Sequence, residues 1–158
     1  MRSVPVRLRV ANRSRTLAVT GLVSDPRLNR IVDRDGRSLP LPSHGLVLSA
    51  VLARILEVEP GGQVRVEVLE GARPVRDVPV TALVDDSMGL QAYMQIDAVH
   101  QLMREGRVVS GVAVTLDPAA VSQFYAAVKA SPSVAAVSLR QVMNFLTRSR
   151  FQRWGRLR

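Results

Sequence analysis

The hydrophobic pattern changes between Gly45 and Met94 in a way that limits what the chain can fold into. Over Ser49-Ala-Val-Leu-Ala-Arg-Ile-Leu56, apolar residues recur three and four positions apart, which predicts a short amphipathic helix. Ser49 suits the N-cap of this helix, because its hydroxyl can accept a hydrogen bond from a free amide of the first turn. Pro60-Gly61-Gly62 then ends the element, because proline and paired glycines interrupt regular structure.

A strand pattern follows these glycines. Val64-Arg65-Val66-Glu67-Val68 alternates strictly between apolar and charged residues, as a half-buried strand does. Residues 70–73 have the length of a hairpin loop, and the run from Pro74 to Val84 predicts the returning strand. Pro79 cannot donate to a ladder, which indicates an edge position or a bulge. One face of the returning strand is expected to carry Val78, Val80, Ala82 and Val84.

The same patterns predict further elements on either side of this stretch. Alternation over 4–10 and 16–23 predicts a hairpin near the N-terminus. Residues 92–94 read as a short strand, and Asp97 is expected to cap a helix from Ala98 to Glu105. The helix between these limits has one apolar face, formed by Val99, Leu102 and Met103.

A strand–helix–strand pattern occupies the residues from 108 to 139. Val108 to Leu116 is apolar, and Asp117-Pro118 reads as an N-cap followed by proline at the first helical position. A helix from Ala119 to Ala130 and a strand from Val134 to Leu139 follow. The helix is expected to bury Val121, Phe124, Tyr125 and Val128.

The order of these blocks resembles a known family. The run G-L-V-L-S-x-x-L-A-x-x-L-x-V-x-P-G-G-x-V, then V-P-V, then G-L-Q-A-Y-M, is similar to the extracytoplasmic domain of FtsX-like ABC-transporter permeases, which include MacB-type permeases. The resemblance implies an α+β fold. Residues 1–107 would be a strand-rich, Sabre-like subdomain with short helices, residues 108–139 a β-α-β half of a porter-like subdomain, and residues 140–158 a basic C-terminal tail.

The resemblance also implies a function at the cell membrane, on its extracytoplasmic (periplasmic) side. ATP hydrolysis in a separate ATP-binding subunit would move transmembrane helices, and this domain would pass the motion to a substrate or partner. Candidate partners are a periplasmic adaptor, a lipoprotein, a lipid or a cell-wall enzyme. The first porter half and the membrane helices are expected to be missing from this stretch, as in an excised domain or a truncated frame.

Charge leaves a second interpretation open. The net charge is +9, which taken alone suggests nucleic acid or an anionic polymer as a ligand of a free-standing basic binding protein. However, five arginines lie within 1–15 and six within 140–158, so the remaining eleven basic residues face all thirteen acids. The body is therefore close to neutral, and a nucleic-acid partner is disfavoured. Aromatic residues, at 4%, are also too few to favour base stacking.

No residue pattern points to catalysis. The chain has no cysteine, and its two histidines, His44 and His100, lack partners at the spacing of a metal site or a catalytic triad. Asp85-Asp86 is interpreted as a solvated loop, because no third oxygen ligand follows at calcium-loop spacing. We therefore expect no enzyme activity, no cofactor and no metal. The polar loop from Asp85 to Leu90 is the expected partner contact, through Asp86, Met88 and Leu90.

Overall fold

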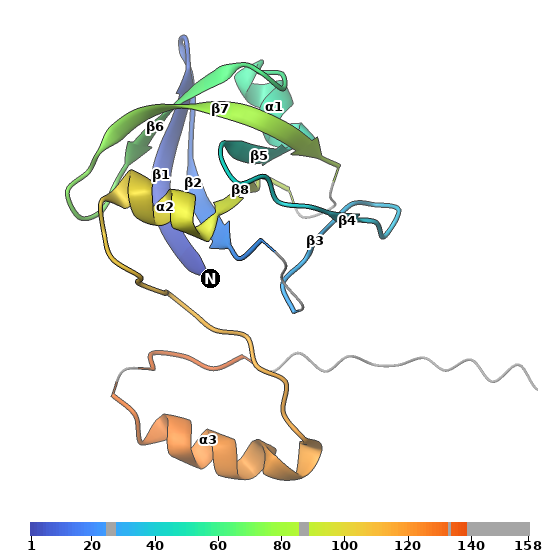
Figure 1. The fold of residues 1–158 in the computed structure, drawn as a ribbon, viewed down its shortest axis with the longest axis vertical. Coiled ribbons are helices and arrows are strands. Elements are labelled where there is room, and N and C mark those ends of the chain that lie inside the picture. Colours follow the sequence, from blue (N-terminus) through green and yellow to red (C-terminus); the bar gives the residue numbers. More distant parts are fainter. Residues whose placement is uncertain (25–27, 86–88, 133, 139–158) are drawn as a thin grey trace, which may run out of the picture. The chain divides into compact units, whose positions relative to one another are not determined.

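The computed structural model describes residues 1–24, 28–85, 89–132 and 134–138. The chain divides into two units, Met1–Val114 and Thr115–Arg158. The first unit is a six-stranded closed barrel with two helices packed on it, which confirms the α+β, strand-rich expectation (Figure 1). No described helix has the length and apolar character that crossing a bilayer requires.

The barrel strands follow the predicted runs closely, except at 46–49, where the sequence predicts no strand. They are β1 (Arg2–Val10), β2 (Arg13–Leu22), β5 (Leu46–Ser49), β6 (Gln63–Val68), β7 (Val75–Val84) and β8 (Ala92–Gln95). Their order around the barrel is β1-β2-β8-β5-β7-β6, and β6 pairs with β1 to close it. Alternate residues point inward, as strand geometry requires. The buried side chains of Leu8, Leu46, Val66 and Met94 therefore share one core.

The pairing pattern repeats itself in two halves. β1–β2 and β6–β7 are antiparallel, whereas β2–β8 and β7–β5 are parallel. Exchanging β1 with β6, β2 with β7 and β5 with β8 leaves the barrel pairing unchanged. Each half also runs directly from a strand into a helix, α1 (Ala50–Leu56) after β5 and α2 (Ile96–Met103) after β8. The barrel thus has an internal twofold pattern of strand pairing.

The two helices are capped by the last residues of the strands before them. Ser49 accepts from the Leu52 amide at 3.3 Å, so the predicted cap of α1 is confirmed. The predicted cap of α2 is wrong: the side chain of Gln95 accepts from the Ala98 amide, and Asp97 lies within the first turn. Gln95 takes the cap because α2 begins at Ile96, before the predicted start, which places Asp97 on a helical position.

A bulge in β7 overturns the predicted single apolar face of that strand. The β5–β7 register shifts at Thr81, since Leu46 pairs with Val80 but Val47 pairs with Ala82. An extra residue turns the following side chains to the other face. Val78 and Val80 therefore pack in the barrel core, whereas Ala82 and Val84 pack in a second cluster outside it. The bulge lies two residues beyond Pro79, where the missing amide had indicated an irregularity.

A small hairpin covers this second cluster. Its strands are β3 (Ile31–Val32) and β4 (Ser38–Leu39), and it projects from the barrel in Figure 1. Ile31 and Leu39 contribute to the cluster that contains Val47 and Val84. The hairpin thereby buries apolar side chains that point out of the barrel wall.

The β-α-β half from 108 to 139 is not confirmed. No strand forms at 108–116 or 134–138, and Leu139 lies outside the described residues. The second unit contains a 3-10 turn η1 (Pro118–Ala120), capped by Asp117, and the helix α3 (Val121–Lys129). The four side chains expected to be buried on α3 are only half-buried. A strand needs a hydrogen-bonding neighbour, and among the described residues 108–116 has one only at Met1.

Candidate functional site

The expected partner loop is held at both of its ends. At its start, the Arg34 amide donates to the Asp85 carbonyl at 2.9 Å, and the Arg34 guanidinium lies 3.1 Å from the Asp85 carboxylate. At its end, Ser49 and Gln91 exchange hydrogen bonds: the Ser49 amide donates to the Gln91 carbonyl, and the Gln91 amide donates to the Ser49 hydroxyl. The loop therefore leaves the barrel from two fixed points.

Ser49 serves two elements at once. Its hydroxyl is fully buried and accepts both from the Leu52 amide and from the Gln91 amide at 3.1 Å. A buried amide without a partner lowers the stability of the fold. Because the serine hydroxyl accepts from both amides, it links the start of α1 to the end of the loop. Sequence reasoning identified the cap but not this second role, because the Gln91 contact joins residues far apart in the chain.

The residues expected to contact a partner are only partly described. Asp86 and Met88 lie outside the described residues, and Leu90 is exposed. Gly89 precedes it with φ +86°, and the space around it is open. Leu90 thus lies on the surface, next to the fixed end of the loop at Gln91.

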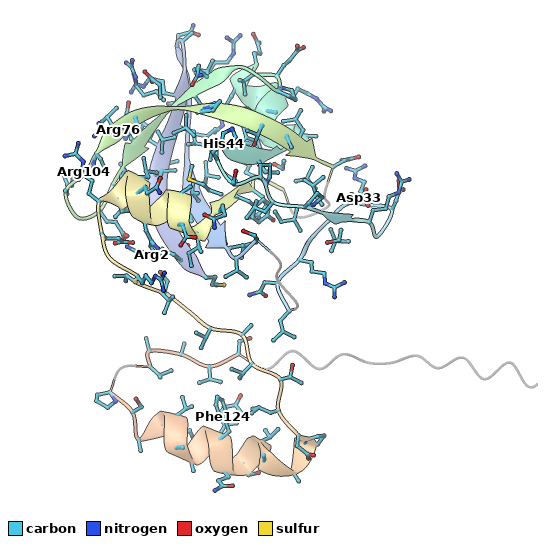
Figure 2. All side chains as sticks on the ribbon, viewed as in Figure 1. Arg2, Asp33, His44, Arg76, Arg104 and Phe124 are labelled. Atoms are coloured by element: carbon cyan, nitrogen blue, oxygen red, sulfur yellow. The ribbon has the colours of Figure 1, made fainter. Side chains whose placement is uncertain are left out.

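The β3–β4 hairpin adds a second exposed segment beside this loop, through Arg34. Asp33, labelled in Figure 2, shapes the hairpin turn because its carboxylate accepts from the amides of Asp35 and Arg37. Gly36 supplies the left-handed conformation at the tip, with φ +78°. The described ends of the loop and the hairpin together form a surface, here called the loop–hairpin surface, that comprises residues 32–39, Asp85, Gly89 and Leu90.

The two histidines lie in different surroundings. His44 is exposed, and its Nδ1 lies 3.3 Å from the Ser43 hydroxyl (Figure 2). His100 is buried on α2, where its Nε2 lies 2.8 Å from the Val108 carbonyl. Within the described part of the chain, no group of three metal-ligating side chains comes together.

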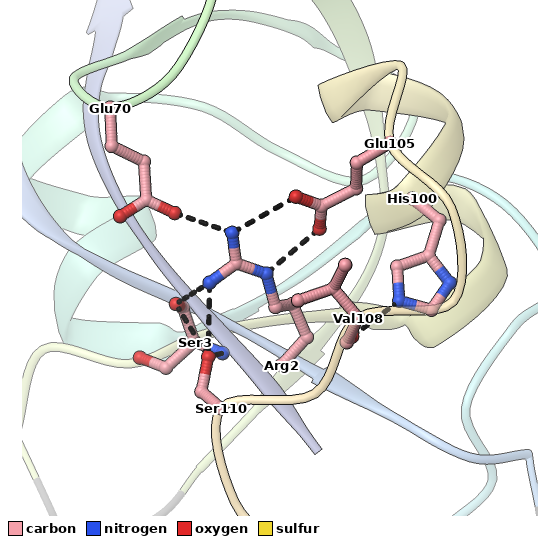
Figure 3. Close-up of polar contacts among 7 residues, drawn as sticks. All are labelled: Arg2, Ser3, Glu70, His100, Glu105, Val108 and Ser110. Atoms are coloured by element: carbon pink, nitrogen blue, oxygen red, sulfur yellow. Dashed lines mark hydrogen bonds and ion pairs between the residues drawn. The ribbon is translucent and has the colours of Figure 1, made fainter. Parts of the chain in front are cut away.

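An ionic cluster around Arg2 was missed by sequence reasoning. The Arg2 guanidinium contacts Glu105 through Nε at 2.8 Å and through Nη2 at 3.1 Å. Nη2 also contacts Glu70 at 2.6 Å, and Nη1 donates to the Ser110 hydroxyl at 3.0 Å (Figure 3). The cluster joins the start of β1, the β6–β7 loop, the end of α2 and the segment that follows it. No local pattern in the sequence could reveal it.

The cluster is shielded enough to affect the ionisation of its members. Hydrogen bonds from the Arg2 guanidinium lower the pKa of the Glu105 carboxyl, and those to Glu105 raise the pKa of Arg2. The Arg2 side chain is 13% exposed and that of Glu105 19%, so solvent screens this pair less than an open surface pair. The arrangement suits a structural fastening, because Arg2 is fully engaged by its partners.

Comparison of the chain with models of known protein families finds no match. Comparison with curated proteins finds none either.

Proposed function

We propose that this chain is a non-enzymatic extracytoplasmic domain of an FtsX-like, MacB-like ABC-transporter permease. It would couple ATP-driven movement of transmembrane helices to substrate export or to a partner outside the membrane. The observation that supports the proposal most is that the blocks of the resemblance belong to one folded unit. The helix, the Pro-Gly-Gly turn, the V-P-V segment and the A-Y-M segment form α1, the α1–β6 turn, β7 and β8 of a single barrel.

To transmit motion, a domain must be rigid enough to move without deforming. A closed barrel suits this role, because each strand is hydrogen-bonded on both sides and no edge can slip. The Arg2 cluster adds ionic contacts between β1, the β6–β7 loop and the end of α2. A displacement applied at one part of the first unit would therefore reach the loop–hairpin surface without being lost in deformation.

The partner surface proposed for this function is the loop–hairpin surface. Residues 34–38 of the hairpin and Leu90 are exposed, the loop is fixed at Asp85 and Gln91, and Leu90 offers an apolar side chain for a contact. A periplasmic adaptor, a lipoprotein, a lipid or a cell-wall enzyme could be the partner. The ATP-binding subunit would act from the other side of the membrane, through the transmembrane part.

The test replaces Asp86, Met88 and Leu90 together with alanine in the full-length permease. We expect transport or partner pull-down to fall at least about tenfold, whereas thermal melting of the domain stays nearly unchanged. A matched control changes Asn12 and Arg15, two exposed residues of the β1–β2 hairpin, to alanine. Intact transport in the triple variant would mean that the partner binds elsewhere. Loss of folding would mean that the loop is structural.

A further inference from the structure

A hollow of about 380 Å³ lies beside the N-terminal half of α2 and shares no residue with the loop–hairpin surface. Its apolar lining is formed by Val23, Ile96 and Val109, and polar side chains complete it. Binding sites for small molecules have this size and this composition, with mainly apolar walls and a few fixed polar groups. It is here called the α2 hollow, and its polar groups indicate which ligand it can hold.

One of these polar groups is a hydrogen-bond acceptor on a buried histidine. His100 is 9% exposed, and its Nε2 lies 2.8 Å from the Val108 carbonyl. A carbonyl oxygen can only accept, so Nε2 carries the hydrogen and Nδ1 of the neutral ring is an acceptor. No described residue donates to Nδ1, which points away from Val108 (Figure 3). Every enclosed side-chain nitrogen or oxygen of the described residues has a partner, so Nδ1 is open to the hollow.

A carboxylate on the same helix face is held in place by the helix cap. Gln95, which caps α2, donates through Nε2 to Asp97 Oδ2 at 2.8 Å and to the Ser24 hydroxyl at 3.5 Å. The other carboxylate oxygen, Oδ1, has no partner among the described residues. Asp97 precedes His100 by three positions, so the two side chains are neighbours on the helix. A carboxylate next to an acceptor nitrogen suits an ammonium group.

A cation completes the lining of the α2 hollow. Arg107 lines it and has no carboxylate partner within the described ranges. A guanidinium group binds a carboxylate through two parallel hydrogen bonds. The hollow therefore combines a cation, an anion and apolar walls, and the matching ligand has an ammonium group, a carboxylate and an aliphatic body.

We propose that the α2 hollow binds a free aliphatic α-amino acid. Its ammonium group would donate to the Asp97 carboxylate and to His100 Nδ1, its carboxylate would accept from Arg107, and its side chain would lie against the apolar lining. Both charges stand beside one aliphatic side chain only in a free amino acid, because peptide bonds neutralise these groups within a peptide. The inference goes beyond the transporter assignment and does not depend on it.

The test titrates the full chain with L-leucine by isothermal titration calorimetry and follows the imidazole nitrogens of His100 by NMR. We expect saturable binding to a single class of sites and a shift of the Nδ1 resonance at saturation. Two analogues separate the charges: 4-methylpentanoate lacks the ammonium group, and 3-methylbutylamine lacks the carboxylate. Each should bind at least about tenfold more weakly than L-leucine.

Two variants place the binding in the α2 hollow. Asp97→Asn keeps the size of the side chain but removes its charge, so it should weaken L-leucine binding at least about tenfold. Asp77→Asn is the matched control, because Asp77 is an exposed carboxylate on β7 outside the hollow, and it should leave binding unchanged.

His100→Gln tests the acceptor nitrogen. Glutamine keeps a donor for the Val108 carbonyl but lacks Nδ1, so binding should again weaken at least about tenfold. Because His100 is buried, thermal melting checks that this variant folds. If it does not fold, Asp97→Asn decides, since Asp97 is exposed.

Three results would overturn the proposal. One is the absence of saturable binding of both L-leucine and L-valine, and another is equal binding of either analogue. The third is L-leucine binding that leaves the His100 Nδ1 resonance unchanged and is unaffected by Asp97→Asn, which would place the amino acid elsewhere.

Discussion

Arg2 and Glu105 are joined by two hydrogen bonds, Nε to Oε1 at 2.8 Å and Nη2 to Oε2 at 3.1 Å, although 103 positions separate them in the chain. Arg2→Ala leaves Glu105 and Glu70 without this cation in a partly shielded site. We expect the free energy of unfolding to fall by about 1–3 kcal/mol in urea denaturation. Arg65→Ala is the control, because its pair with Asp77 is more than half exposed on both sides, so solvent screens the pair and its loss should cost clearly less stability. Equal losses in the two variants would contradict a structural role for the Arg2 cluster.

The Glu105 carboxyl gives this cluster a pH dependence. Its pKa is lowered in the folded state, mainly by the hydrogen bonds from Arg2, so the unfolded chain binds a proton at higher pH than the folded chain does. The stability that it contributes is complete above the ordinary glutamate pKa, about 4.3, and is lost as pH falls through the lower folded value. Glu105→Gln should remove this part of the acid sensitivity. The prediction is refuted if the free energies of unfolding of the unchanged chain and of Glu105→Gln decrease in parallel below about pH 4.3.

Ser49→Ala tests the double role of the buried hydroxyl. The change leaves the Leu52 and Gln91 amides without their acceptor, and we expect a loss of about 1–2 kcal/mol together with faster hydrogen exchange at Gln91. Ser38→Ala, at an exposed position of β4, should change stability by less than about 0.5 kcal/mol. Unchanged exchange at Gln91 would show that the serine does not hold the loop.

The two glycines before β6 are needed for different reasons. Gly61 has φ +92°, a conformation that side chains with a Cβ rarely adopt, although the space around it is open. A Cβ at Gly62 would lie 2.7 Å from a Val58 methyl group and 3.0 Å from the Glu59 carbonyl. Replacing both with valine should misplace the α1–β6 turn and destabilise the domain by more than about 2 kcal/mol. On the transporter proposal, it should also weaken transport in the full-length protein.

The control for the glycine variant is Gly106→Ala. No atom lies within 4 Å of a Cβ added at Gly106, so this change should be nearly neutral. On the transporter proposal, ATP hydrolysis should continue in the valine variant, because the ATP-binding subunit would lie across the membrane. Unimpaired transport with a destabilised turn would argue against transmission through this barrel.

No enzyme activity is expected of the chain itself. Incubation with ATP, a peptide substrate or an ester should give no turnover above that of a heat-denatured sample. Reproducible turnover that His44→Ala or His100→Ala removes would overturn this prediction. His44→Ala is the cleaner of the two, because His44 is exposed, whereas His100 is buried and contacts the Val108 carbonyl.

The sequence predicted both barrel helices and every barrel strand except β5, but it did not predict how the strands are arranged. Local periodicity is enough to predict α1, β6 and the hairpin of β1 and β2, because each depends on neighbouring residues. Closure of the barrel depends on the parallel pairs β2–β8 and β5–β7, which join distant segments that no local pattern connects. The Arg2 cluster was missed for the same reason. Pro79 indicated an edge position or a bulge, but not that a bulge at Thr81 turns the later residues of β7 to the other face.

The candidate surface was predicted in part. Exposure of Leu90 follows from the polar character of its loop, whereas the β3–β4 hairpin beside it could not be foreseen. Leu28, Ile31 and Val32 lie at helical spacing, but Ile31 and Val32 form a strand. Burial of Ile31 in the second cluster decides the conformation there, which is a tertiary effect.

The most direct test of the transporter proposal uses the full-length permease that the proposal implies, expressed together with its proposed ATP-binding subunit. Spin labels at Arg54→Cys and Arg104→Cys, two exposed positions at the ends of α1 and α2, report a distance within the barrel. A label at Arg54→Cys and a second label on the ATP-binding subunit report the distance between the barrel and that subunit. If the barrel moves as a rigid body, ATP changes the distance between the barrel and the ATP-binding subunit and leaves the distance within the barrel unchanged. A protein that neither enters the membrane nor binds the ATPase, or a barrel that itself deforms with ATP, would contradict it.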